Sequence, residues 1–268
     1  VTPTPFTSAL MEGCIEKGCD LLLGMNYPQR VLSQQGITNL VNAIAAIDQV
    51  VFQNRFTTLE KLAEALQADF VGHETLHRHL RNAPKWGNDA PALQAFAKRW
   101  MAMRDRILRR LEYEFHTPRH LNCHVTRSLN YVFGGRIGAS PDGRPAGEPL
   151  SDSIGAVTGT QQEGPTALLN TICGLQPAQH WDGGYNLNLT LQMQPSRELL
   201  EHLVEPFFAA EGQELQINAL DEATLLDAQQ HPDHYPDLLV RVAGFSARFI
   251  DLSAEQQAEI IKRAQTTN

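Results

Sequence analysis

The stretch Arg241-Val242-Ala243-Gly244-Phe245-Ser246-Ala247-Arg248-Phe249 places a glycine directly after an apolar run. The run, Leu238 to Val242, has the composition of a short buried strand. A glycine after such a strand is typical of a tight turn, because glycine adopts positive φ angles without steric cost. Taken alone, Gly244 is therefore interpreted as a turn residue. A functional role for it depends on the surrounding sequence.

Upstream of this turn, strand-like and helical segments alternate. The strand-like segments are Tyr185 to Met193 and Glu214 to Leu220, where apolar residues recur at every second position. The helical segments have apolar residues at every third or fourth position, and they are Thr166 to Leu175, Glu198 to Ala210 and Asp221 to Gln230. A last helical segment, Ser253 to Thr266, follows the turn. This alternation predicts a parallel α/β sheet or barrel, with function in the loops at the strand ends.

The first half of the sequence is mostly helical. Three amphipathic segments predict helices at Thr38 to Phe52, Thr57 to Ala68 and Ala90 to Tyr113. Glycine and proline then recur from Phe133 to Pro149 around Asp142 and Arg144, and this shift in composition marks the best internal boundary. We expect two domains, residues 1–146 and 147–268, and we expect Asp142 and Arg144 to hold a turn together.

Composition and motifs exclude several classes of function. The net charge of -8 disfavours nucleic acid or an anionic membrane surface as a partner. No apolar run approaches the roughly 20 residues of a membrane span, and the sequence is interpreted as cytoplasmic. Walker, Rossmann, His-Glu-x-x-His and Gly-x-Ser-x-Gly motifs are all missing from the sequence. The four cysteines are too scattered for a disulfide framework or a zinc site, so we expect no bound cofactor and no metal.

The nonamer at 241–249 resembles the glycyl radical signature Arg-Val-x-Gly-Tyr-Ser-Ala-x-Phe. The resemblance continues in both directions, at Asp227 to Pro232 before the nonamer and at Glu259 to Ile261 after it. It extends upstream to Ser140-Pro141-Asp142-Gly143-Arg144, Ala146 to Leu150, Gly164 to Ala167 and the turn Asn82 to Asp89. The chain thus resembles the C-terminal part of a glycyl radical enzyme of the pyruvate formate-lyase and dehydratase type.

This resemblance implies an α/β fold, the C-terminal part of a ten-stranded β/α barrel of the pyruvate formate-lyase type with a glycyl radical loop. Residues 1–146 would be the remnant of the pyruvate formate-lyase-like domain and 147–268 the glycine radical domain. Gly244 would carry the stored radical, because a Cα radical is delocalised over the flanking amides most easily where no side chain opposes planarity. Phe245 departs from the family pattern: it replaces a tyrosine, and with it a hydroxyl that could hold the loop.

The resemblance also implies partners and a modification. A radical S-adenosylmethionine activating enzyme with an iron–sulfur cluster would install the glycyl radical, which would then oxidise a cysteine to a thiyl radical. In dehydratase-like members this cysteine lies in a Gly-Cys-x-Glu loop whose carboxylate is the general base. Gly13-Cys14-Ile15-Glu16 imitates that loop, so Cys14 and Glu16 are candidates, but the surrounding sequence resembles a segment downstream of the true cysteine loop. A buried structural thiol is the alternative reading of Cys14.

The function that follows is radical storage for anaerobic cleavage of a C–C or C–O bond in a small polar substrate, as in lyases, dehydratases or formate acetyltransferase. The partners would be the missing N-terminal half or a larger subunit, with a second copy of the chain as a further arrangement. Two alternatives remain: a spare-part subunit that restores a damaged enzyme, and an inactive truncated product. The start at Val1 fits a fragment, and an ordinary mature N-terminus is the alternative.

Other residues that could bind a ligand have simpler interpretations. His73 and His77 share a helical face, but without a third ligand a solvated face is expected. Cys123 and His124 are adjacent and carry no metal spacing. Cys173, within an apolar helix, is expected in the core.

Overall fold

A computed structural model of the 268-residue chain describes residues 2–124, 129–191, 195–219, 221–242 and 245–265. The predicted position of the radical, Gly244, lies outside the described residues together with Ala243. Within the described residues, none of the helices combines the length and the apolar character that crossing a membrane requires.

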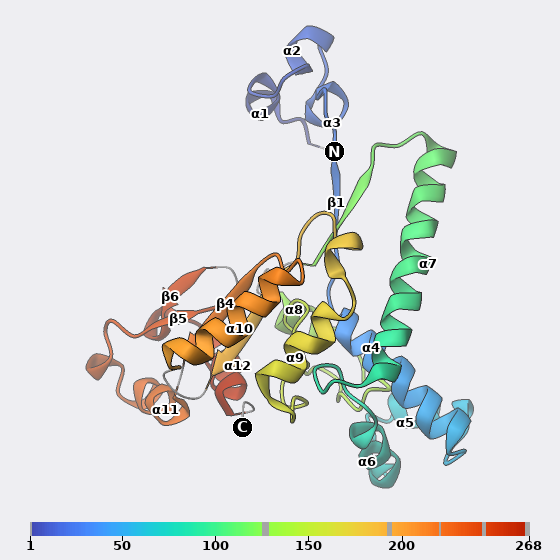
Figure 1. The fold of residues 1–268 in the computed structure, drawn as a ribbon, viewed down its shortest axis with the longest axis vertical. Helices are drawn as coiled ribbons and strands as arrows, with labels where there is room; N and C mark the ends of the chain where they lie inside the picture. The colour runs from blue at the N-terminus through green and yellow to red at the C-terminus, as the bar shows by residue number, and fades with distance from the viewer. Residues whose placement is uncertain (1, 125–128, 192–194, 220, 243–244, 266–268) are drawn as a thin grey trace.

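The first half contains the predicted helices and several elements that were not predicted. A small N-terminal cluster of α1 (Pro5–Ala9), α2 (Cys14–Lys17) and α3 (Leu21–Gly24) lies apart from the body of the molecule (Figure 1). The predicted helices are α4 (Ile37–Ile47), extended by a π-helical turn at Asp48–Gln53, then α5 (Leu59–Gln67) and the long α7 (Pro91–Phe115). The elements missed by the sequence reading of this half include β1 (Arg30–Ser33), α6 (Glu74–Asn82), β2 (His120–Cys123) and α8 (Asn130–Gly134).

The second half follows the predicted alternation of strands and helices. Its elements are α9 (Gly164–Cys173), β3 (Leu187–Leu191), α10 (Arg197–Ala209), β4 (Leu215–Ala219), α11 (Glu222–Gln230), β5 (Leu239–Arg241), β6 (Ser246–Arg248) and α12 (Ala254–Gln265). Strands β3 and β4 pair in parallel from Leu187 opposite Leu215 to Leu191 opposite Ala219, which confirms the predicted parallel arrangement. Because the connection between two parallel strands must cross over, α10 lies between them in the sequence.

The strand pairs join into one parallel arc. Strands β1 and β2 pair in parallel from Arg30 opposite His120 to Ser33 opposite Cys123. A parallel bridge between His124 and Tyr185 then links the chain after β2 to the chain before β3. The strand order is therefore β1-β2-β3-β4, all in one direction, as expected for part of a β/α barrel.

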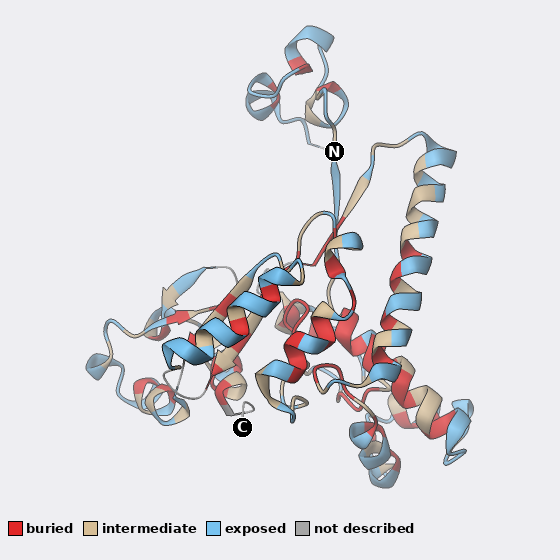
Figure 2. Cartoon of the chain, in the orientation of Figure 1, coloured by how far each residue is buried: buried red, intermediate tan, exposed pale blue. Residues whose placement is uncertain are grey.

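The main hydrophobic core lies between the arc and its helices. Leu187, Leu189 and Leu191 of β3 are buried on one face, as the alternation of a strand requires. They pack in one cluster with α4, α7, α9 and α10, whose buried residues include Val41, Leu93, Met101, Leu168, Ile172, Leu203 and Phe207. The buried segments accordingly gather in the middle of the molecule, and much of the N-terminal cluster and the far end of α7 are exposed (Figure 2).

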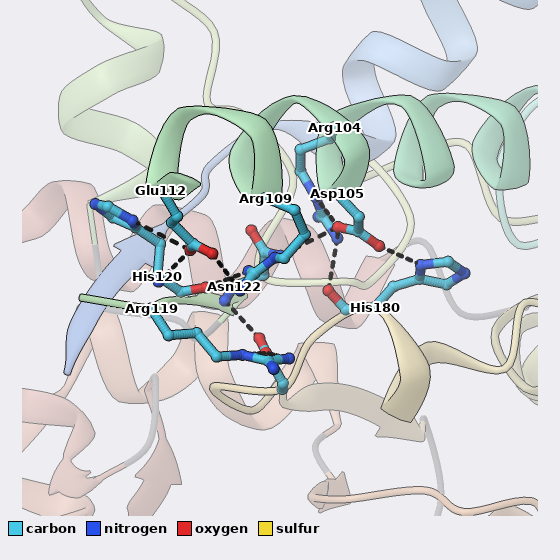
Figure 3. Close-up of polar contacts among 9 residues, drawn as sticks. Arg104, Asp105, Arg109, Glu112, Arg119, His120, Asn122 and His180 are labelled. Carbon is cyan, nitrogen blue, oxygen red and sulfur yellow. Dashed lines mark hydrogen bonds and ion pairs between the residues drawn. The ribbon is translucent and has the colours of Figure 1, made fainter. Parts of the chain in front are cut away.

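Polar side chains attach α7 to β2 and to the turn that precedes β3. Asp105 accepts hydrogen bonds from the amide of Asn122 at 3.1 Å and from His180 at 2.6 Å. Buried Arg104 donates to the carbonyl oxygen of His180 at 2.5 Å and pairs with Asp105 at 2.7 Å. Figure 3 shows these side chains from α7, β2 and the 180s turn pointing toward one another. The network fixes β2 in register just before His124.

Candidate functional site

A short hairpin flanks the segment that contains the predicted radical position. Strands β5 and β6 pair antiparallel, with Arg241 opposite Ser246 and Leu239 opposite Arg248. Beyond the last pair, the backbone N–H of Val242 donates to the carbonyl oxygen of Phe245 at 2.9 Å. The strand predicted at 238–242 is observed at Leu239–Arg241, and the assignment of the radical to Gly244 stays a prediction.

The hairpin has its own small core against α11 and α12. Val240 and Val242 are buried, whereas Leu239, which precedes them, is 63% exposed. The two valines pack in a second cluster with residues from both helices and from the turn after β6: Leu225, Ala228, Phe249, Ile260, Ile261 and Ala264. Strand alternation thus places the valines inside and fixes which face of β5 meets the helices.

The same hairpin is joined to β4 through an asparagine side chain. The Oδ1 of Asn218 accepts from the backbone N–H of Arg241 at 3.0 Å, and its Nδ2 donates to the carbonyl oxygen of Arg241 at 3.0 Å. A primary amide offers one acceptor and two donors, so it satisfies both backbone groups as a neighbouring strand would. The guanidinium of Arg241 also donates from Nε to Gln216 at 2.8 Å. β5 is therefore bound to the face of β4 that presents Gln216 and Asn218, opposite the face of Leu215 and Ile217.

Arg263 of α12 joins the end of β5 to the chain before β3. Its Nη1 donates to the carbonyl oxygen of Val242 at 3.1 Å and lies 2.9 Å from the carboxylate of Asp152. Its Nε pairs with Glu259 at 3.2 Å, and Asp152 also accepts from Asn188 of β3 at 2.7 Å. The side chains of Arg263, Asp152 and Glu259 are only 14%, 10% and 6% exposed. Such shielded, charge-assisted bonds are stronger than exposed ones, so they hold the backbone one residue before Ala243.

A cavity of about 60 Å³ lies beside this ion cluster. Its lining includes Asp152, Asn188, Thr190 and Arg263, so polar groups dominate the wall formed by β3. Arg263 therefore lines this partly enclosed cavity and also binds Val242, the last described residue before positions 243 and 244. Asn218, Asp152 and Arg263 were not predicted as site residues; the polar alternation of Gln216 and Asn218 within a strand pattern was the one signal that pointed toward Asn218.

His124 is a fully buried imidazole at the junction of the two strand pairs. Its Nδ1–H donates to the carbonyl oxygen of Gln34 at 2.8 Å, and its ring faces that of Trp181 with centroids 5.8 Å apart. Burial lowers the pKa of His124 to about 4, against the opposing effect of the hydrogen bonds to Gln34 and Ser153. The imidazole is therefore neutral at pH 7 and acts as a structural donor.

This shift gives a pH dependence to the stability of the fold. The folded pKa of about 4 lies below the ordinary value of 6.5, so the unfolded chain takes up a proton first as the pH falls. The free energy of unfolding should decrease between about pH 6.5 and pH 4, by roughly 3 kcal/mol at about 1.4 kcal/mol per pKa unit. Urea unfolding at several pH values checks this, and His124→Gln should flatten the profile in that window. Parallel profiles for both proteins would contradict it.

The structure places Cys14 and Glu16 far from the hairpin. Both lie on α2, in the N-terminal cluster that stands apart from the body of the molecule containing β5 and β6 (Figure 1). Cys14 is 3% exposed and Glu16 is exposed, so this carboxyl does not have the buried environment of a general base. Gly13 has a φ of 92°, and a Cβ there would meet Oδ1 of Asn26 at 2.4 Å. Local packing thus accounts for the glycine and cysteine of this Gly-Cys-x-Glu sequence, and their catalytic role stays an untested prediction.

The remaining candidates are structural. Asp142 accepts from the hydroxyl of Ser140 at 2.5 Å, and Arg144 donates to the carbonyl oxygen of Glu148 at 2.7 Å, which confirms that both hold the turn. The expected solvated face is wrong for His77, because its ring stacks on Phe70 at 4.1 Å and its Nε2 lies 2.9 Å from the carbonyl oxygen of Gly143. The half-buried thiol of Cys173 packs against the main core as predicted, and burial raises its pKa.

Comparison with protein families identifies the chain. A family model described as pyruvate formate lyase-like matches residues 1–134, which is half of the sequence. The chain belongs to the pyruvate formate-lyase-like family. A second family model, described as glycine radical, matches residues 150–250 and so includes the hairpin. The expected resemblance to glycyl radical enzymes is confirmed.

Known relatives of this pyruvate formate-lyase-like chain are much longer than it is. It is 36% identical over 278 residues to a protein of Escherichia coli (strain K12) named probable dehydratase YbiW, covering 96% of this chain and 34% of that protein. It is 32% identical over 278 residues to trans-4-hydroxy-L-proline dehydratase of Clostridioides difficile, covering 99% of this chain and 34% of the relative. The chain thus spans about a third of the length of these relatives, and it corresponds to their C-terminal part.

Solved structures of glycyl radical enzymes share the fold of this family member. The glycerol-bound form of the B12-independent glycerol dehydratase from Clostridium butyricum matches with a TM-score of 0.84 and 32% identity, over 98% of this chain and 34% of the other. A glycyl radical enzyme from Archaeoglobus fulgidus matches with a TM-score of 0.85 and 32% identity, over 97% of this chain and 34% of the other. The predicted fold, part of a pyruvate formate-lyase-type β/α barrel, is confirmed.

Proposed function

We propose that this chain stores a radical on Gly244 and supplies it for anaerobic cleavage of a C–C or C–O bond in a small polar substrate. The observation that carries the proposal is the glycine radical match over residues 150–250, which covers a hairpin anchored at the end of β5. Asn218 binds the backbone of Arg241, and Arg263 binds the carbonyl oxygen of Val242. These two anchors limit the movement of the chain that leads into the radical position.

A separate activating enzyme of the radical S-adenosylmethionine class would remove one Cα hydrogen from Gly244. The glycyl radical would then take the hydrogen atom of a cysteine thiol, which restores glycine and leaves a thiyl radical to react with substrate. Two of the relatives named above, those from Clostridioides difficile and Clostridium butyricum, are dehydratases, which break a C–O bond when water leaves, and this supports a hydroxylated substrate. The radical is a modification of the chain itself, so the proposal requires no resident cofactor.

The reacting cysteine would come from another polypeptide or from a further part of the same one. Cys14 lies on α2, far from the hairpin (Figure 1). All four residues of β1 are exposed, and Val31 and Leu32 are 55% and 38% exposed. A strand with that exposure offers an edge on which a partner can continue the arc. We propose the N-terminal part of a full-length enzyme, or a larger partner subunit, as the occupant.

The domain boundary between residues 146 and 147 is part of this proposal. Its support is that the first family match ends at residue 134 and the second begins at residue 150. The main core contains residues from both sides of this boundary, among them Trp86, Leu93, Leu168 and Leu187. The two proposed domains would therefore share one core.

The pure 268-residue chain, once activated, should convert neither glycerol nor trans-4-hydroxy-L-proline. The reason is that the radical has no suitably placed thiol to oxidise. Product formation under anaerobic conditions measures this, first for the chain alone and then after mixing with a full-length relative whose own radical glycine has been replaced by alanine. Turnover only in the mixture would support radical supply to a partner, the spare-part role.

Turnover by the chain alone would contradict that expectation. Cys14→Ala would then be the decisive variant, with Cys19→Ala as its matched control, because Cys19 is exposed in the same N-terminal cluster. Loss of turnover in Cys14→Ala alone would assign the thiyl radical to Cys14. A chain that cannot accept a radical at all would support the inactive product instead.

A further inference from the structure

Asp227, His231 and His234 lie on one face at the C-terminal end of α11. Asp227 is in the last full turn of the helix, and His231 follows four residues later, which is the spacing of neighbours on a helical surface. A 3₁₀ turn at Pro232–His234 comes next, and its three-residue repeat places His234 above His231. The change of helix type therefore brings one carboxylate and two imidazoles together from a segment of only eight residues.

The ligand atoms of these three side chains are close enough to share one ion. The Nδ1 of His231 donates to Oδ1 of Asp227 at 2.9 Å, and the rings of His231 and His234 stack with centroids 5.5 Å apart. One potential ligand atom from each of the three residues lies within 4.8 Å of the others. Ligands about 2.0–2.2 Å from a zinc ion are about 3–4 Å apart, so small side-chain rotations complete the site.

The carboxylate of Asp227 is already oriented by a second partner. The hydroxyl of Tyr235 donates to its Oδ2 at 2.6 Å, which leaves Oδ1 directed toward His231. Hydrogen bonds of this kind fix metal-ligating carboxylates in known sites. An ion between Oδ1 and Nδ1 would replace the hydrogen of the present bond. Nδ1 of His231 would lose its proton, and the ring proton would be on Nε2 instead, which is the other tautomer of neutral imidazole.

The local charge also favours a cation. Residues 221–240 contain Asp221, Glu222, Asp227, Asp233 and Asp237 and no lysine or arginine. The C-terminus of α11 adds the negative end of a helix dipole. His231 and His234 are both exposed, so an ion can reach them without opening the fold.

We propose that Asp227, His231 and His234 form a site for a divalent transition-metal ion of the zinc class, with water completing the coordination. Two imidazoles and a carboxylate suit zinc, nickel or copper rather than calcium or magnesium. The ion would fasten the end of α11 to the turn that leads into β5. It would therefore restrain the strand whose far end continues into residues 243 and 244.

Isothermal titration of the untagged chain with zinc chloride tests the site, in a Cys19→Ser background because Cys19 is an exposed thiol that can bind zinc. We expect one zinc ion per chain, at least tenfold weaker binding in His234→Ala and in Asp227→Asn, and unchanged binding in His202→Ala. His202 is the matched control, an exposed histidine on α10 that donates to the carbonyl oxygen of Glu198 at 2.7 Å.

Cobalt(II) gives a second readout that does not depend on activity. Visible absorption bands of a low-coordinate cobalt site should grow with one equivalent and should be lost in His234→Ala. Asp227→Asn keeps an acceptor for Tyr235, so a folded variant that binds weakly isolates the effect of the charge. The proposal is overturned if no saturable binding occurs, or if His234→Ala binds zinc as tightly as the parent. Neither result bears on the radical at Gly244.

Discussion

Gly244→Ala should abolish the electron paramagnetic resonance signal that the activated chain develops with an activating enzyme, S-adenosylmethionine and a reductant. The expected wild-type signal is that of a carbon-centred radical split by one remaining α hydrogen. An alanine radical would carry a methyl group that opposes planarity with the two flanking amides. Hydrogen removal by the activating enzyme would therefore leave no stable radical on this chain. The effect is complete loss, which makes it the largest that we expect.

Gly138→Ala is the matched control for this experiment. A Cβ at Gly138 meets no atom within 4 Å, so the variant should fold and develop the wild-type signal. Exposure of the activated wild-type chain to air should then cut the backbone at Gly244 and release a short C-terminal peptide that begins near Phe245. A signal that persists in Gly244→Ala, or a cut mapped to another residue, would refute the assignment.

The sequence predicted the second half of the fold well because its strands and helices have clear periods. In β3, Leu187, Leu189 and Leu191 alternate with polar residues, and the structure buries those three leucines on one face. The first half was harder to predict. Strand β1 has four exposed residues, and α6 has only Leu76 and Leu80 buried. Neither pattern is strong enough to identify its element from sequence alone.

The candidate site shows a similar division. The motif around Gly244 was visible as a continuous stretch, and the family comparison supports it. The groups that anchor the hairpin are distant in sequence: Asn218 lies 23 residues from Arg241, and Arg263 lies 21 residues from Val242. Each is an ordinary residue of a strand or helix, and its contact exists only after the chain has folded. Local patterns contain no information about such pairs.

Arg263→Met should lower the free energy of unfolding by about 3–5 kcal/mol, the cost of removing one partner from a buried ion cluster. The variant leaves the carboxylates of Asp152 and Glu259, 10% and 6% exposed, without the cation that now lies between them. Methionine replaces the aliphatic stem of arginine and keeps its apolar contacts, so lost packing contributes little. The hairpin also loses the bond to the carbonyl oxygen of Val242, so the radical yield after activation should fall.

Arg248→Met is the matched control, because Arg248 pairs with Asp251 at 2.8 Å while both side chains are about half exposed. Exposed pairs contribute about 0–1 kcal/mol, so this variant should unfold in urea close to the wild type. Adding Asp152→Asn to Arg263→Met should recover part of the loss, since it removes one of the two carboxylate charges that faced Arg263 and keeps an acceptor for Asn188. Equal stability of Arg263→Met and Arg248→Met would show that the cluster does not anchor the hairpin. The hairpin would then be anchored through Asn218 and Gln216, which bind Arg241 and not the residue next to Ala243.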